Sequence, residues 1–258
     1  MATEALKARF EPVRPTFQGI TQSRRISSGI PGLDQLIQGG LLEKRVYTIC
    51  GPPGSGKTTF SMQFLVQGGF EGNPGLYVAF HEAPENIYLD MCNYTFGLPN
   101  LVKRGYVQFL DMSGANPLAW LTEDDESPSP GNVLMVIQKI IQEQNIRRLV
   151  IDSLKAIKFS YSKPQVARRD MTRFMHGLKE LGCTTVIISE LEDPDRYEIE
   201  QHLSHGLIFL HNFFQSNKMV RSIQIMKMRG TKHDCDMRKI VFGPKGIQVD
   251  AKKVDRLS

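Results

Sequence analysis

Hydrophobic residues along the chain form short apolar runs that alternate with segments of helical spacing. The apolar runs predict buried strands over 46–50, 75–80, 106–111, 147–152, 183–189, 207–213, 221–228 and 246–249. Between two of these runs, apolar side chains recur at Val133, Val136, Ile137, Ile140 and Ile141, a spacing that predicts an amphipathic helix. Strands that alternate with helices indicate an α/β fold with a mainly parallel sheet and helices on both faces. The late succession of strands indicates an antiparallel C-terminal edge.

A helix is also expected within residues 27–40, SSGIPGLDQLIQGG. A serine can act as its N-cap, Pro31 is near the first helical position, and Gly39 with Gly40 marks the end. Further helices are expected over 58–65, 84–91 and 171–178. The run 122–132, TEDDESPSPGN, is acidic and proline-rich without a period, which is typical of a disordered loop.

The length of 258 residues, of which 41% are hydrophobic, suits one large core. We expect a core domain over 25–250, an N-terminal arm over 1–24 that is flexible or docks on a neighbour, and a tail over 251–258. No apolar run approaches the ~20 residues that span a bilayer, and the N-terminus lacks a secretory signal. A cytoplasmic protein without membrane attachment is therefore expected.

Cysteine content and net charge exclude few of the possible cofactors and binding partners. The four cysteines include no C-x-x-C pair, so we do not expect a structural zinc site. A net charge of +5 and a pI near 9.0 permit an anionic partner. This charge alone does not decide for nucleic acid, because proteins that bind small anions also need positive charge.

Residues 51–58, GPPGSGKT, match the phosphate-binding pattern G-x-x-x-x-G-K-[ST] between a predicted strand and a predicted helix. In such a loop, backbone N–H groups and the helix N-terminus surround phosphate oxygens. Lys57 is expected to reach the β and γ phosphates, and Thr58 to bind Mg²⁺. The expected cofactors are ATP and Mg²⁺, and the candidate binding residues are Gly51, Gly54, Ser55, Gly56, Lys57, Thr58 and Thr59.

Three further residues, at the ends of two predicted strands, are candidates for the chemistry of a nucleotide site. Asp152 ends the strand LVID and is the candidate second ligand of Mg²⁺, although such an aspartate can also cap a helix. His81 and Glu82 end the strand GLYVAF and are candidates for orienting or deprotonating water. Spacing alone leaves open whether they are instead solvated residues that cap the helix beginning at Pro84.

Four segments together resemble the KaiC-like branch of the RecA superfamily. They are ISSGIPGLDQLIQGGLLEKRVYTICGPPGSGKT, GLYVAFHEAPENI, RLVIDSLKAI and KMRGTKH, in this order, and the resemblance runs from about Ile26 to Val249. It implies a RecA-type P-loop ATPase core, related also to RadA, that assembles as a ring, commonly a hexamer, with ATP at the subunit interfaces. Single-domain archaeal members are similar in size.

The resemblance also implies that Lys227 and Arg229 complete the site of a neighbouring subunit. In the family, this Lys-x-Arg pair reaches the γ phosphate bound by the next subunit. Their i and i+2 spacing places both side chains on one side of an extended chain. The alternative is a solvated strand end whose charges discourage aggregation.

The sequence departs from the family pattern at two places. Members of the family usually carry two adjacent glutamates where this chain has His81 and Glu82, so we expect slow hydrolysis that depends on Glu82. Circadian members carry a Ser-Thr autophosphorylation pair where this chain has Gln201 and His202, and His205 stands where an aspartate is usual. An autokinase role is therefore not supported.

Three functions remain open from the sequence. The first is an oligomeric ATP-driven switch that acts on a protein partner. The second is a RadA-like recombination accessory that binds single-stranded DNA. The third is a scaffold that binds ATP without hydrolysing it. The acidic run 190–200 would repel phosphates in a ring channel, whereas the basic run 153–169 carries Phe159 and Tyr161 among its cations. We expect DNA binding to be weak or absent.

Overall fold

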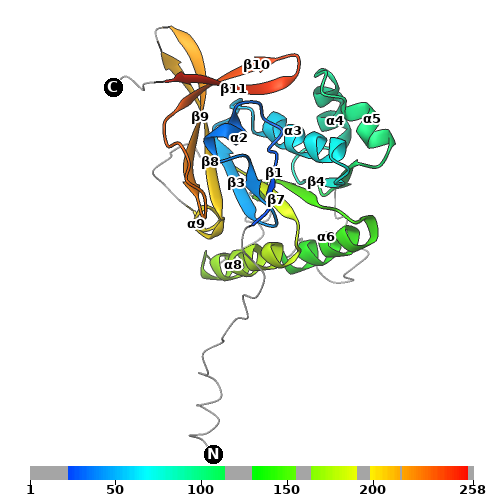
Figure 1. Ribbon diagram of the computed structural model, residues 1–258. Helices are drawn as coiled ribbons and strands as arrows, with labels where there is room; N and C mark the ends of the chain where they lie inside the picture. Colours follow the sequence, from blue (N-terminus) through cyan, green and yellow to red (C-terminus); the bar gives the residue numbers. More distant parts are fainter. Residues whose placement is uncertain (1–22, 114–129, 155–163, 191–197, 216, 255–258) are drawn as a thin grey trace, which may run out of the picture.

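A nine-stranded sheet forms the centre of the protein (Figure 1). The computed structural model describes residues 23–113, 130–154, 164–190, 198–215 and 217–254. The strand order is β11-β10-β9-β8-β3-β7-β6-β4-β5. The strands are β3 (Val46–Gly51), β4 (Gly75–Ala79), β5 (Val107–Asp111), β6 (Arg148–Asp152), β7 (Thr184–Glu190), β8 (Gly206–Gln215), β9 (Lys218–Met228), β10 (Arg238–Gly243) and β11 (Gly246–Lys253).

The strands from β8 to β5 are parallel, and the edge from β8 through β9 and β10 to β11 is antiparallel. This arrangement confirms the predicted fold class. A separate pair, β1 (Arg25–Ile26) and β2 (Leu41–Leu42), lies outside the main sheet. β11 continues to Lys253, past the boundary expected at Asp250.

Helices cover both faces of the sheet. One core contains apolar residues of α3 (Lys57–Phe70), α4 (Pro84–Cys92) and α5 (Leu98–Lys103), and a second core contains those of α6 (Pro130–Gln144) and α8 (Pro164–Glu180). The predicted stripe on α8 is buried, because Met171, Phe174, Met175 and Leu178 are each at most 2% exposed. Its spacing is therefore the signature of core packing.

The helix expected within 27–40 is shorter than predicted and has no serine cap. α2 (Leu33–Leu36) follows Gly32, whose φ of 86° no serine adopts readily. The Ser27 hydroxyl donates to the Asp34 carboxylate at 2.7 Å, and the Ser28 hydroxyl accepts from the Ile30 N–H at 3.2 Å. The serines thus stabilise the turn before the helix, and the prediction of a serine N-cap was wrong.

Several elements lack a clear signal in the sequence. α5, α9 (Ile199–Leu203) and β10 were not predicted, because each is short and half of the residues of β10 are polar or glycine. α6 begins at Pro130, within the run expected to be a loop, since proline is favoured in the first turn of a helix. Residues 122–129 of that run and 1–22 of the expected arm lie outside the described residues.

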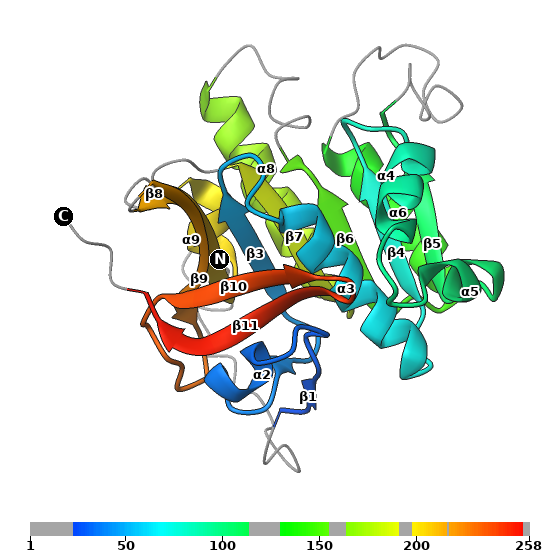
Figure 2. The same cartoon turned by 90° about the horizontal axis from the view of Figure 1, so that it is seen from above.

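The hairpin of β10 and β11 lies beside α3 (Figure 2). Gln63 of α3 accepts a hydrogen bond from the Ile247 N–H at 2.6 Å and donates one to the Ile247 carbonyl at 3.1 Å. A Cβ atom on Gly56 would lie 2.5 Å from the ring of Phe242. The antiparallel edge thereby supports the first turn of the helix that follows the phosphate-binding motif.

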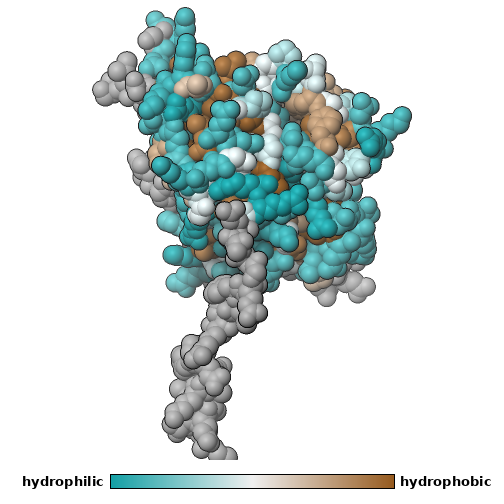
Figure 3. Space-filling view, in the orientation of Figure 1, coloured by the Kyte–Doolittle hydropathy of each residue, from teal (hydrophilic) through white to brown (hydrophobic). Residues whose placement is uncertain are grey.

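Hydrophilic residues cover most of the face shown in Figure 3, with smaller hydrophobic areas between them. Among the helices that the structure describes, none has the length and apolar character required to cross a bilayer.

Candidate functional site

The phosphate-binding motif forms the connection between β3 and α3. β3 pairs in parallel with β7 and β8, so its carboxyl end lies in the middle of one edge of the sheet. Gly51, Gly54 and Gly56 have φ angles of 149°, 73° and 101°. A Cβ on Gly51 would lie 2.2 Å from the Leu210 carbonyl oxygen, so this position requires glycine. The tight turn leaves the N–H groups of the first turn of α3 available to an anion.

The polar side chains of the loop fit a phosphate group. Lys57 Nζ donates to the Gly51 carbonyl at 2.8 Å and the Pro52 carbonyl at 3.0 Å, and burial lowers its pKa. The Ser55 hydroxyl is buried and has no hydrogen-bond partner in the described part of the chain. Thr59 is also buried. A cation, a helix N-terminus and an orphaned hydroxyl at one place are the donors that phosphate oxygens require.

Asp152 and Thr58, the candidate ligands of Mg²⁺, both contact the hydroxyl of Tyr77. This hydroxyl donates to Asp152 Oδ2 and is also hydrogen-bonded to Thr58. Burial raises the pKa of Asp152, whereas Tyr77 and Lys57 act in the opposite direction. One carboxylate and one hydroxyl suit Mg²⁺, which takes few protein ligands and completes its shell with water and phosphate oxygens.

These groups open into a cavity of about 430 Å³. Its lining consists of Lys57, Thr58, His81, Glu82, Ile87, Asp152, Ile188 and Glu190. The structure therefore brings together the phosphate-binding lysine, both candidate metal ligands and both candidates for water activation. His81 and Glu82 are exposed, and neither caps α4, because its N-cap is Ala83.

Sequence reasoning missed Glu190, which lines this cavity, and Tyr77, which holds the Asp152 carboxylate next to it. Glu190 ends β7 and was assigned only to an acidic run, yet β7 lies between β3 and β6 in the sheet. Because the carboxyl ends of neighbouring parallel strands meet at one edge, that rule could have found Glu190. Tyr77 lies within a buried strand, and its pattern gives no sign that its hydroxyl reaches Asp152.

Lys227 and Arg229 lie where the parallel strands begin, at the edge of the sheet opposite the phosphate-binding loop. β9 runs antiparallel to β8, so Met228 pairs with Gly206, the first residue of β8. The ammonium of Lys227 donates to the carbonyls of Gln201 and His202 at 3.0 and 2.9 Å, and Arg229 donates to the latter at 3.3 Å. A six-residue strand is about 20 Å long, so β3 separates this pair from the phosphate-binding loop of its own chain.

The surroundings of Lys227 are strongly basic. Burial, together with the charges of Arg229 and Lys179, lowers the pKa of Lys227 to about 8. Both cations of the pair thus contact the same carbonyl oxygen, as their spacing predicts, but they do not line the nucleotide cavity of their own chain.

Comparisons with known proteins give one consistent result. The sequence profile described as the ATPase KaiC matches residues 26–254. The chain is 31% identical to a UPF0273 protein of Aeropyrum pernix over 242 residues, covering 90% of this chain and 96% of the relative. It is 32% identical over 248 residues to the circadian clock oscillator protein KaiC of Prochlorococcus marinus. That match covers 92% of this chain and 48% of KaiC, so the chain spans about half the length of this relative.

A solved structure shows the same fold. The KaiC-like protein PH0186 of Pyrococcus horikoshii superposes with a TM-score of 0.77 at 30% sequence identity. The match covers 89% of this chain and all of the archaeal protein.

Proposed function

The chain belongs to the KaiC-like ATPase family of the RecA superfamily, and we propose that it is a slow, ring-forming ATPase that acts as a nucleotide-dependent switch. One observation carries this proposal. The carboxylates and the phosphate-binding lysine lie at one edge of the sheet, whereas Lys227 and Arg229 lie at the other. A complete site then needs two copies of the chain.

Mg·ATP is proposed to bind in the 430 Å³ cavity. Backbone N–H groups from Gly51 to Thr59 and the ammonium of Lys57 hold the phosphates. Thr58 and Asp152 hold Mg²⁺, with the Tyr77 hydroxyl fixing the position of the Asp152 carboxylate. When bound, Mg²⁺ neutralises charge on the phosphate oxygens during phosphoryl transfer.

Hydrolysis is proposed to depend on Glu82. This carboxylate lines the cavity next to the exposed His81, which occupies the position where the family pattern has its first glutamate. A carboxylate can accept a proton from attacking water, whereas a histidine beside it cannot supply the negative charge of that glutamate. This chain thus keeps, in Glu82, one of the two acidic residues of the family pattern. Slow hydrolysis is expected because the other is replaced by His81. Glu190 lines the same cavity and is a further group that can orient water.

Lys227 and Arg229 are proposed to reach the γ phosphate bound by a neighbouring subunit. Their own loop is about 20 Å away along β3, and a head-to-tail contact brings the two unlike edges together. Repetition of such a contact closes into a ring, for which we propose a hexamer. ATP that bridges two subunits favours assembly by mass action.

The ring is proposed to act in the cytoplasm on a protein partner. One experiment separates this function from its alternatives, namely ATPase rate and particle size measured with and without single-stranded DNA. The proposal predicts slow turnover, ATP-dependent assembly and no effect of DNA. DNA-stimulated turnover would instead indicate a recombination accessory. Assembly without turnover would indicate a scaffold.

A further inference from the structure

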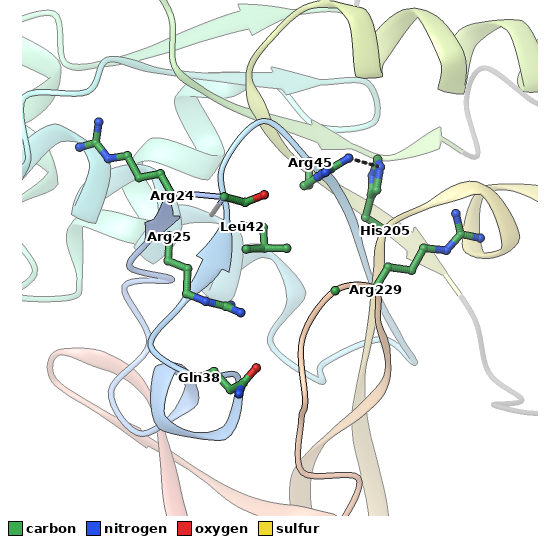
Figure 4. A pocket seen from close by; sticks show the side chains of 9 residues that line it. Arg24, Arg25, Gln38, Leu42, Arg45, His205 and Arg229 are labelled. Carbon is green, nitrogen blue, oxygen red and sulfur yellow. Dashed lines mark hydrogen bonds between the residues drawn. The ribbon is translucent and has the colours of Figure 1, made fainter. Parts of the chain in front are cut away.

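A second cavity of about 1,070 Å³ lies where the parallel strands begin. Its lining consists of Ser23, Arg24, Arg25, Gln38, Leu42, Arg45, His205, Arg229 and Gly230. Figure 4 shows Arg45, His205 and Arg229 on one side of the opening, with Arg25, Leu42 and Gln38 across from them. The cavity shares no lining residue with the nucleotide cavity, and its volume suits a small organic ligand.

The charge of this cavity is entirely positive. Four of its nine described lining residues are arginines, one is a histidine, and none is acidic. Within the described residues, neither Arg24, Arg45 nor Arg229 forms an ion pair with a carboxylate. Arg25 uses its guanidinium for the carbonyls of Ile37 and Gly40 and for the Thr231 hydroxyl. Its charge nevertheless remains uncompensated at the opening.

Two hydrogen-bond donors approach the ring of His205 at the centre of this group. The Val46 N–H lies 3.2 Å from Nδ1, and Nη1 of Arg45 lies 3.2 Å from Nε2. A neutral imidazole has one acceptor nitrogen, so it accepts from one of these donors and not from both. In the tautomer in which Nδ1 accepts from Val46, the Nε2–H and Arg45 both donate, and an anion with several lone pairs beside them accepts from both.

The imidazole remains neutral in this setting. Burial, together with the charges of Arg45, Lys179 and Arg229, lowers the pKa of His205 to about 4. The backbone that carries the ring is held from both sides, because the backbone N–H of His205 donates to the Val46 carbonyl at 2.7 Å and its carbonyl accepts from the backbone N–H of Arg229 at 2.8 Å. The position of the residue is thus fixed before a ligand arrives.

We propose that this cavity is a second anion site, which binds a phosphorylated small molecule through Arg45 and His205. Phosphate is favoured among anions because its oxygens can accept the Arg45 and His205 protons together and still face the remaining arginines. Arg229 lines the same cavity, so the bound phosphate competes for the cation that acts on the neighbouring nucleotide. This regulatory consequence rests on the proposed role of Arg229, but the binding itself does not.

The test measures binding of inorganic pyrophosphate by calorimetry, without nucleotide, in a Lys57→Ala background that weakens the phosphate-binding loop. Arg45→Gln removes the central guanidinium and should weaken binding at least tenfold. His205→Asp places a carboxylate beside Arg45 and should abolish it. Arg104→Gln is the matched control, because this arginine follows α5 and does not line the cavity, and it should leave binding unchanged.

Nuclear magnetic resonance of the imidazole provides a second measurement on the same protein. Pyrophosphate should shift the ring signals of His205 and raise its pKa from about 4, because a bound anion stabilises the protonated ring. Equal affinities for Arg45→Gln and Arg104→Gln would overturn the proposal. Binding that occurs with Lys57 present and vanishes entirely in the Lys57→Ala background would also overturn it, since the anion would then occupy the nucleotide site.

Discussion

The two ends of the parallel strands carry charges of opposite sign. We call the carboxyl ends of the strands the acidic edge of the sheet and the amino ends the basic edge. At the carboxyl ends of the strands, Asp152, Glu82 and Glu190 line a cavity whose described lining includes one lysine, Lys57. At the amino ends, Lys227 and Arg229 lie with further cations around an opening whose described lining has no acid. We propose that the acidic edge binds a metal-bound triphosphate and that Lys227 and Arg229 of a second copy act on it.

Strand direction explains this separation. All parallel strands end at the same edge, so residues that follow β3, β4, β6 and β7 converge there. β9 runs against β8, and the residues that end it are therefore carried to the opposite edge. Substitutions on either edge should consequently have distinct effects on binding, turnover and assembly.

The largest effect is expected from the basic edge. Arg229→Ala should lower the turnover rate by about 10³-fold, the range of arginine fingers, while ATP binding to the isolated subunit stays unchanged. Arg229 is exposed, so its truncation leaves the core intact. Steady-state phosphate release and calorimetry measure the two quantities, with Arg104→Ala as the control. A similar loss of turnover in both variants would count against a specific role.

A smaller effect is expected at the acidic edge from the group next to the attacking water. Glu82→Gln should lower turnover by about 10²-fold, as for loss of a general base, and His81→Glu should raise it. Glu85→Gln, an exposed change in the first turn of α4, is the control. If Glu82→Gln leaves single-turnover rates intact, another group such as Glu190 is the base.

Lys57→Ala should reduce affinity for ATP without affecting the basic edge. A charged hydrogen bond contributes about 1.5–3 kcal/mol, which corresponds to an affinity loss of about ten- to hundredfold. Calorimetry with ATP checks this value, and Lys103→Ala on α5 is the matched control. Unchanged affinity would refute the assignment of residues 51–58 as the nucleotide loop.

The smallest effect is expected on the pH dependence of the free energy of unfolding, through His205 at the basic edge. The pKa of His205 falls from 6.5 to about 4 on folding, so the unfolded chain binds a proton that the folded chain rejects. The free energy of unfolding should therefore decrease as pH falls from 6.5 toward 4, with no contribution from this residue above that window. His205→Gln should lose less stability between pH 7 and 5 in urea titrations, whereas the exposed His176→Gln should behave as wild type.

The sequence predicts those features of the site that depend on residues close together in the chain. Residues 51–58 are contiguous, and the strands around them have apolar runs, so the loop, its lysine and the fold class follow from the pattern. Asp152 and Glu82 follow from their places at strand ends. Sequence does not reveal contacts between distant residues, such as that of Arg45 with His205 or that of Tyr77 with Asp152. These pairs depend on strand order, which composition and periodicity leave undetermined.

The most direct test of completion across an interface mixes two defective proteins. Lys57→Ala lacks the cation of the acidic edge, and Arg229→Ala lacks that of the basic edge, so each alone should have little activity. If the edges act between subunits, mixed rings contain some interfaces with Lys57 on one side and Arg229 on the other, and ATPase activity recovers in a ratio-dependent way. No recovery at any ratio, in mixtures shown by light scattering to co-assemble, would contradict the account.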